Sequence, residues 1–273
     1  MPESPQVIVI TPTLGRSPWL DQAVESVAAR QSGRWGLVHL LVAPADQVGA
    51  LADRYPGTTV MAEEREGGGL YGAVNYGAHR TKGWRWLTYL NDDDLLREGF
   101  DRLLGATDQE AADIIYGRVS YIDADGRNLG AFPVERRPRR ILSLMIAGIP
   151  PFTQQGTLVG RDCFENLGGF DTDFQLAADH DFWVRAVLRG ASFRFVPSEV
   201  GSFRLRPGQL SADQETVRKE LGSIHARYFP PENRLTRLRI RTAFRIRHAH
   251  SILGRRIRTG HWTTGKSVWR VPE

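Results

Sequence analysis

Three adjacent carboxylates at positions 92–94 form the densest group of chemically useful side chains in the sequence. They follow Asn91 at the end of an apolar run, residues 84–90, which has the pattern of a buried strand. Like charges repel, so an ordered turn of this kind indicates a neutralising cation, and oxygen ligands favour Mg²⁺ or Mn²⁺ shared with a substrate phosphate. The alternative is a solvated turn in which one Asp caps a helix that begins near Leu95.

A second pair of carboxylates, Asp179 and Asp181, lies at the start of a predicted helix over residues 178–189. A carboxylate within hydrogen-bond reach of a hydroxyl can remove its proton as the hydroxyl attacks. Asp179 is the preferred base, because Asp181 precedes Arg185 by four residues and has the spacing of an ion pair on one helix face. The structural alternative for Asp179 is an N-cap. We interpret His180, between them, as a surface or supporting residue.

The elements that must position these side chains alternate over the first hundred residues. Apolar, β-branched runs predict strands at 7–10, 37–42, 58–61 and 84–90, and helical periodicity predicts helices at 18–30, 45–54 and 71–80. This alternation predicts an α/β fold with a parallel sheet covered on both faces, and ligands bind at the carboxyl ends of such strands. The second half is predicted to be mixed, with a hairpin at 113–132, a strand at 157–159 and helices at 139–147, 178–189 and from about 211 to 230.

Composition and charge divide the chain. With 273 residues and 41% apolar residues the chain can bury a sizeable core, so it is globular. Residues 232–273 hold eleven Arg or Lys against two Glu, whereas the rest of the chain holds 25 basic and 29 acidic residues. We therefore predict a domain over residues 1–231 and a basic tail over 232–273, separated at Pro230 and Pro231.

The basic tail has apolar residues interleaved with its arginines, as in amphipathic helices that bind anionic membrane surfaces. Packing against the body or against a second subunit is the alternative, and no nucleic acid is expected as a partner. The oligomeric state stays open. The single cysteine, Cys163, and the lack of a long apolar segment or a secretory signal predict a cytoplasmic protein, with a peripheral position on the inner face of the membrane as the alternative.

From the strand before Asn91 onward, the sequence resembles the family 2 glycosyltransferases with a GT-A fold. The resemblance covers roughly residues 5 to 212 and depends on an ordered set of motifs: residues 7–13, 69–78, 90–94, 168–171, 178–185 and 202–211. It implies an inverting, nucleotide-sugar-dependent enzyme with a DXD-type motif and a saccharide or lipid-linked saccharide acceptor. Cell-surface polysaccharide synthesis is the implied pathway.

The resemblance also implies a role for individual residues. Asp93 is expected to coordinate the metal, or Asp94 if the register shifts by one, and Asp92 is expected to face the ribose of the nucleotide. Asp179 matches the base. The donor site is further implied to include three residues from other segments: Thr11, Thr13 and Asn75.

The sequence departs from the family pattern at three places. No acidic residue follows the second strand, where the family meets the nucleobase, and position 72 is Gly instead of an acidic residue. Arg206 stands where the family often has a His. An arginine cannot ligate a cation, so we predict that Arg206 contacts phosphate, with Arg204 as the alternative.

Two rival functions remain at this point: a sugar-phosphate nucleotidyltransferase, and a non-enzymatic peripheral membrane or nucleic-acid-binding protein. Against the nucleotidyltransferase, this sequence lacks the Gly- and Lys-rich loop that such enzymes usually have after the first strand. Residues 260–267 match the P-loop pattern, but only six residues follow them, and a P-loop requires a following helix. We therefore expect a metal-dependent glycosyltransferase.

Overall fold

The protein is built on one curved mixed sheet. The structure, a computed structural model, describes residues 6–31, 35–63, 68–108, 112–229 and 234–259. Within these ranges the strand order is β3-β2-β1-β4-β8-β6-β9-β5, and β7 pairs with β6. The strands are β1 (Val7–Pro12), β2 (Leu37–Ala43), β3 (Thr59–Ala62), β4 (Trp86–Tyr89), β5 (Leu95–Leu96), β6 (Ile114–Ile122), β7 (Asn128–Ala131), β8 (Thr157–Gly160) and β9 (Phe193–Arg204).

The two halves of the sheet differ in strand direction. Strands β1 to β4 are parallel to one another, with β1 between β2 and β4. Strand β8 runs antiparallel to both β4 and β6, whereas β6 and β9 are parallel. The parallel first half and the mixed second half that the sequence predicts are therefore confirmed.

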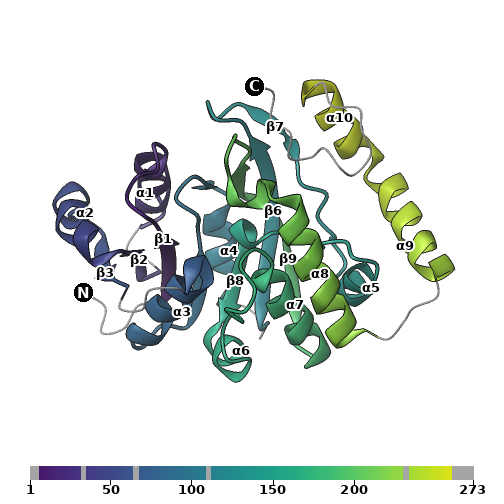
Figure 1. Ribbon diagram of the computed structural model, residues 1–273, viewed down its shortest axis with the longest axis horizontal. Helices are drawn as coiled ribbons and strands as arrows, with labels where there is room; N and C mark the ends of the chain where they lie inside the picture. The colour runs from purple at the N-terminus through teal and green to yellow at the C-terminus, as the bar shows by residue number, and fades with distance from the viewer. Residues whose placement is uncertain (1–5, 32–34, 64–67, 109–111, 230–233, 260–273) are drawn as a thin grey trace.

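Helices cover both faces of the sheet, as Figure 1 shows. Strand β1 illustrates why: Val7 and Val9 pack in a core with α1 and α4, while Ile8 and Ile10 pack in another core with α3 and α7. Successive side chains of a strand point to opposite faces, so an unbroken apolar strand is buried on both sides. The helices are α1 (Leu20–Ala28), α2 (Val48–Arg54), α3 (Gly69–Arg80), α4 (Phe100–Ala106), α5 (Ile141–Ile146), α6 (Arg161–Asn166), α7 (Ala178–Leu188), α8 (Gln214–Tyr228), α9 (Arg234–Arg247) and α10 (Ala249–Thr259).

The sequence patterns missed part of the second half. The twelve-residue strand β9 was not expected, and the segment after the acidic turn is the short strand β5 instead of the start of a helix. Leu95 and Leu96 pair with Ser202 and Gly201 of β9, so the sheet takes up their backbone groups and the helix begins only at Phe100.

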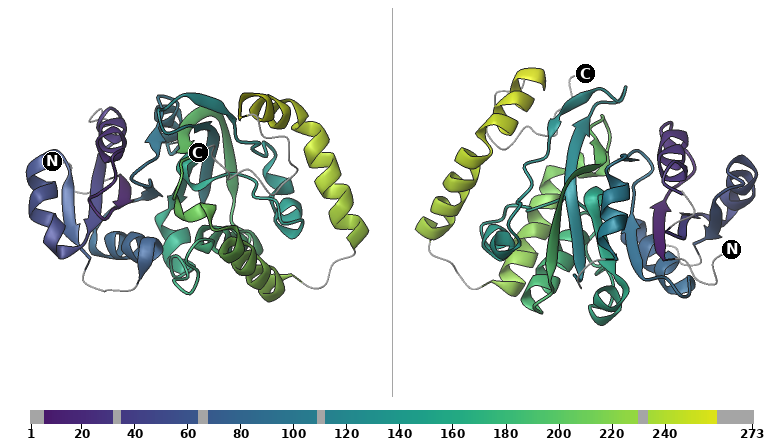
Figure 2. Two further views of the ribbon diagram at one scale, coloured as in Figure 1. Left: turned by 45° about the horizontal axis from the view of Figure 1, so that its top comes forward. Right: turned by 180° about the vertical axis from the view of Figure 1, so that it is seen from behind.

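Residues 234–259 of the basic tail form α9 and α10, which run along one side of the molecule beyond α5 and β7 (Figures 1 and 2). Phe244 and His248 are buried against the body, and Arg241 donates from Nε to the carbonyl oxygen of Ala147 at 2.8 Å. Arg247 forms an ion pair of 3.1 Å with Glu135. The predicted boundary at 230–231 and the P-loop-like residues 260–267 lie outside the described residues. None of the described helices is both long and apolar enough to span a bilayer.

Candidate active site

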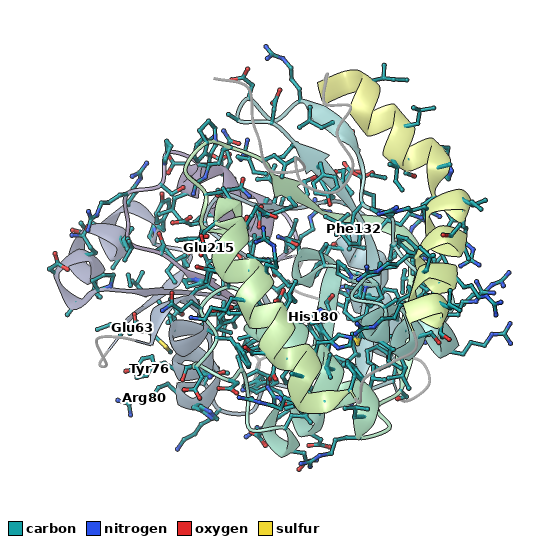
Figure 3. All side chains as sticks on the ribbon, turned by 45° about the vertical axis from the view of Figure 1, so that its right-hand side comes forward. Glu63, Tyr76, Arg80, Phe132, His180 and Glu215 are labelled. Carbon is teal, nitrogen blue, oxygen red and sulfur yellow. The ribbon has the colours of Figure 1, made fainter. Side chains whose placement is uncertain are left out.

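A continuous cleft of about 3020 Å³ crosses the carboxyl ends of β1 and β4 and extends between α8 and α9. Thr13 after β1, residues 91–93 after β4, and Asp179 of α7 all line it. The labelled side chains of Phe132 and His180, which also line the cleft, lie between α8 and α9 in the view of Figure 3. Small-molecule sites have volumes of roughly 300–1,000 Å³, so this cleft has room for two substrates.

The acidic turn places its three carboxylates in three different environments. Asp92 accepts a hydrogen bond of 2.6 Å from Thr13 Oγ1, and Ser17 Oγ donates to its backbone oxygen at 3.0 Å. Burial raises the pKa of Asp92, and the hydrogen bond from Thr13 opposes that shift. The contact joins the loops that follow β1 and β4, so the sheet itself brings Thr13 and Asp92 together at the cleft.

Asp93 lies at the cleft with an arginine against it. Arg206 Nε donates to Asp93 Oδ2 at 2.6 Å, and the side chains of Asp93 and Arg206 are 10% and 23% exposed. The Arg206 guanidinium also lies over the ring of Trp19, 5.1 Å from its centroid. Trp19 was not among the residues expected at the site, because no local sequence signal distinguishes it from a core aromatic residue.

Asp94 points away from the cleft and is completely buried. Its carboxylate accepts hydrogen bonds from Gln155 Nε2 at 2.7 Å, the Arg204 backbone N–H at 2.8 Å and Asn91 Nδ2 at 3.1 Å. Burial, followed by the nearby charge of Asp93, raises its pKa. Through these hydrogen bonds Asp94 connects the acidic turn to β9 and to the segment before β8.

Arg204, the alternative phosphate contact, is also fully buried. It donates to the backbone oxygens of Asp93, Asp123 and Ala124, and to Gln22 Oε1, at 2.7–3.0 Å. Its guanidinium therefore holds the acidic turn in place from beneath, and Arg206 is the arginine of this pair that reaches the cleft.

Two residues expected near the donor have interior contacts instead. Thr11 is fully buried, and its hydroxyl lies 2.9 Å from His39 Nε2 of β2. Asn75 donates to the Phe170 carbonyl oxygen at 2.8 Å and accepts from the Phe170 N–H at 2.9 Å. Neither side chain lines the cleft.

Asp179 lies in the first turn of α7 and is partly exposed to the cleft. Its Oδ1 accepts hydrogen bonds from the Tyr71 hydroxyl at 3.2 Å and from the His180 backbone N–H at 2.7 Å. Burial raises the pKa of Asp179 to about 6, and both hydrogen bonds oppose the shift. A carboxylate with a pKa near the working pH is well suited to take a proton.

The neighbours of Asp179 behave differently. Asp181 is fully buried and pairs with Arg185 Nε at 2.6 Å, as their spacing predicts. Arg185 also donates to the backbone oxygens of Leu167 and Gly169, so this ion pair holds α7 against the preceding loop. Burial lowers the pKa of His180 to about 4, which keeps its imidazole neutral at the cleft.

The residues at the cleft can accommodate a divalent cation only in part. Mg²⁺ is commonly held by one or two carboxylates plus substrate phosphates, and Asp93 supplies one such carboxylate at the cleft. In the described part of the chain, no group of three His, Cys, Asp or Glu residues lies close enough to hold a metal. The donor set therefore fits a cation shared with a diphosphate, and does not fit a cation held by the protein alone.

Solved structures share this fold. TarS from S. aureus has a TM-score of 0.62 at 16% identity, and the match covers 89% of this chain and 43% of TarS. TarS 1–349 in complex with UDP-GlcNAc also has a TM-score of 0.62, with 90% of this chain and 73% of that chain covered at 14% identity. The mannosyltransferase PcManGT from Pyrobaculum calidifontis, in complex with GDP-Man and Mn²⁺, has a TM-score of 0.57 at 18% identity, with 95% and 75% covered. The chain therefore has a GT-A glycosyltransferase fold.

Sequence comparison agrees with the fold. The uncharacterized glycosyltransferase Rv1514c of Mycobacterium tuberculosis (strain H37Rv) is 28% identical over 245 residues, which cover 84% of this chain and 87% of the relative. The family model described as glycosyl transferase family 2 matches residues 8–163. These findings favour the glycosyltransferase over both rival functions. Since the model spans more than half of the chain, this protein is a glycosyltransferase that belongs to glycosyl transferase family 2.

Proposed function

We propose that the protein is a metal-dependent, inverting glycosyltransferase that moves a sugar from a nucleotide-sugar donor to a hydroxyl of a saccharide or lipid-linked saccharide. The observation that carries the proposal is that Asp93 and Asp179, from segments 86 residues apart in the chain, line one cleft. Asp93 faces a cationic side chain, whereas Asp179 has a raised pKa of about 6. Asp93 is thus suited to a site for a charged donor, and Asp179 is suited to removing a proton.

The donor is assigned to the end of the cleft at β1 and β4. Asp92 and Thr13 would meet the ribose, and Arg206 would bind the diphosphate, since guanidinium groups form strong hydrogen bonds with phosphate oxygens. Asp93 would hold Mg²⁺ or Mn²⁺ together with the diphosphate. When bound, the cation would stabilise the charge that develops on the leaving nucleotide. The matching structures in complex with UDP-GlcNAc, or with GDP-Man and Mn²⁺, support a nucleotide-sugar donor.

Asp179 is assigned as the base. It would accept the proton of the acceptor hydroxyl while that oxygen forms the new bond to the anomeric carbon and the bond to the nucleoside diphosphate breaks. Tyr71 and the His180 N–H fix Oδ1, which orients the carboxylate in the cleft. Attack from the face opposite the leaving group inverts the anomeric centre, so no covalent enzyme intermediate is required.

The acceptor and the place of action are proposed from α9. Its residues Leu235, Leu238 and Ile246 are 62%, 59% and 71% exposed, on the face opposite the buried Phe244 and His248. Exposed arginines flank this apolar stripe. Such a helix can lie in an anionic membrane interface, which would bring the cleft to a lipid-linked acceptor on the inner face of the membrane. We propose cell-surface polysaccharide synthesis as the pathway.

Nucleotide binding and product analysis test the proposal together. UDP, GDP, dTDP and CDP are added to the protein with and without Mn²⁺ or Mg²⁺, and a ligand that binds the native state raises its melting temperature. We expect one nucleotide to raise the melting temperature only when the metal is present, and we expect this metal-dependent rise to be absent in Asp93→Ala. With the matching nucleotide sugar, release of nucleoside diphosphate identifies glycosyl transfer, whereas release of pyrophosphate would identify nucleotidyl transfer. No shift with any nucleotide would contradict the donor site.

A further inference from the structure

The segment before β8 carries a group of buried polar atoms without hydrogen-bond partners among the described residues. In Gln154, which is 6% exposed, both Nε2 and Oε1 lack a partner. The same is true of Thr153 Oγ1 and of Gln155 Oε1. All three residues line the cleft. A buried polar group without a partner is destabilising, so four such atoms in three residues indicate a surface that is completed by a ligand.

This segment is held rigidly from both sides. Gln155 Nε2 donates to Asp94, and the Thr157 hydroxyl donates to the Thr153 carbonyl oxygen at 2.8 Å. A Cβ on Gly201 of β9 would lie 2.6 Å from the Gln155 backbone oxygen, which shows how closely the segment packs on the sheet. The unpartnered amide of Gln154 therefore projects from a fixed backbone.

The segment lies between the proposed donor site at the acidic turn and the proposed base, Asp179. Gln155 ties it to the acidic turn on the donor side. On the other side, Phe152 packs against Trp183 with ring centroids 5.2 Å apart, and Trp183 follows Asp179 by one helical turn in α7. A molecule that presents a hydroxyl to Asp179 would thus have this segment beside it.

The side-chain chemistry selects the class of ligand. The Gln154 amide is neutral and offers both a donor and an acceptor, as does the Thr153 hydroxyl. A sugar hydroxyl also donates and accepts, so it satisfies both amide atoms. A phosphate group, which only accepts when ionised, would leave Gln154 Oε1 without a donor. The cleft surface at Gln154 therefore matches an uncharged pyranose ring.

We propose that Gln154, assisted by Thr153, binds hydroxyl groups of the acceptor sugar next to the reacting hydroxyl and determines acceptor specificity. This inference rests on the proposed function, because it assigns a substrate class to the acceptor half of the same cleft. Gln154 is a binding and specificity-determining residue and takes no proton. A site built to hydrogen-bond a hydroxyl rejects the analogue that lacks it, because its polar groups are then left unpaired.

The test uses the full chain, the nucleotide sugar that it consumes, and a panel of p-nitrophenyl pyranosides with their deoxy analogues. Gln154→Met keeps the length of the side chain and removes both polar atoms. We expect its kcat/KM for the preferred pyranoside to fall about tenfold to a hundredfold, with KM for the donor unchanged. For the wild-type protein, one deoxy analogue should have a kcat/KM at least tenfold below that of its parent sugar. Gln154→Met should use this analogue and the parent sugar equally well.

The control is Gln6→Met, since Gln6 is exposed at the amino end of β1, away from the cleft. Its kinetic constants should equal those of the wild-type protein. Because Gln154→Met removes two buried polar atoms that have no partner among the described residues, this variant should melt at or above the wild-type temperature.

Several results would overturn the inference. One is a kcat/KM for the acceptor that is unchanged in Gln154→Met. Another is a rise in the KM for the donor that accompanies the fall in kcat/KM for the acceptor. The third is that no uncharged pyranoside increases donor consumption by the wild-type protein. In each of these cases donor consumption by the wild-type protein leaves the proposed function standing. If the wild-type protein consumes no nucleotide sugar at all, the proposed function fails and the inference fails with it.

Discussion

Arg206 and Asp93, which both line the cleft, form an ion pair of 2.6 Å, although 113 residues separate them in the chain. The ring of Trp19 lies beneath the guanidinium and limits where it can move. The pair neutralises the one cleft carboxylate that the metal proposal needs. Arg206 and a divalent cation are therefore alternative or joint partners of Asp93, and the donor diphosphate is the group that can bind both.

The first prediction concerns this arginine. Arg206→Met removes a charge-assisted hydrogen bond to phosphate, which is worth about 1.5–3 kcal/mol, so affinity for the nucleoside diphosphate should fall about tenfold to a hundredfold. Isothermal titration calorimetry with and without Mn²⁺ measures the change. The control is Arg161→Met, which removes an arginine of α6 that pairs with Glu165 outside the cleft. Equal affinity in Arg206→Met and the wild-type protein would rule out the phosphate contact.

The second prediction separates two adjacent carboxylates. Asp94→Ala removes a fully buried carboxylate that accepts three hydrogen bonds and should lower the free energy of unfolding by about 3 kcal/mol or more. Asp93→Ala removes one ion pair whose arginine partner stays partly exposed, so its free energy of unfolding should fall by less than that of Asp94→Ala, while metal-dependent nucleotide binding is lost. Urea unfolding and thermal shift measure the two effects. The reverse pattern would identify Asp94 as the functional carboxylate.

The contrast between these carboxylates also shows what the sequence is able to predict. A strand pattern that ends in residues 91–94 places an acidic turn at the carboxyl edge of a sheet, and the structure has it there. The pattern does not reveal which carboxylate faces inward, because Asp94 is turned inward by Arg204 and Gln155 from distant segments. Adjacent residues on a turn have no periodicity from which a face can be read.

The same limit applies to the other donor-site expectations. The predicted first strand placed both Thr11 and Thr13 at its carboxyl end. In the structure, however, Thr11 contacts His39 within the sheet, and Thr13 contacts Asp92 at the cleft. Strand β9, which carries Arg204, was not predicted because its polar residues and Pro197 interrupt the apolar alternation. Local patterns thus located the site, whereas its long-range contacts required the fold.

The third prediction is the pH dependence of transfer. Asp179 must be ionised to accept a proton, so kcat/KM should fall as the pH drops below about 6, the value to which burial raises its pKa. The Tyr71 hydroxyl donates to the carboxylate and favours its ionised form. Tyr71→Phe should therefore raise the pKa further and move the acidic limb to higher pH by up to about one unit.

Its control is Tyr76→Phe on the same helix. The Tyr76 hydroxyl accepts a hydrogen bond from Arg80 Nε at 3.3 Å, neither residue lines the cleft, and Figure 3 shows both away from His180. The pH profile of this variant should match that of the wild-type protein. In Asp179→Asn the rate should fall about a hundredfold to ten-thousandfold, and the limb should vanish. A limb that persists unchanged in Asp179→Asn would exclude Asp179 as the base.

The last prediction tests the exposed face of α9. Leu235, Leu238 and Ile246 contribute little to folding because more than half of each side chain is exposed, but their burial in a lipid interface would favour binding by up to about 1.5–3 kcal/mol each. Replacing all three with Gln should leave the melting temperature unchanged and reduce co-sedimentation with phosphatidylglycerol-containing vesicles at least tenfold. Binding by the wild-type protein should also weaken with added salt and without the anionic lipid, because arginines flank the stripe. Leu188→Gln, on α7 and 48% exposed, is the matched control and should bind as the wild-type protein does. If the triple variant sediments as well as the wild-type protein, α9 does not contact the membrane through this face, and the lipid-linked acceptor loses its structural support.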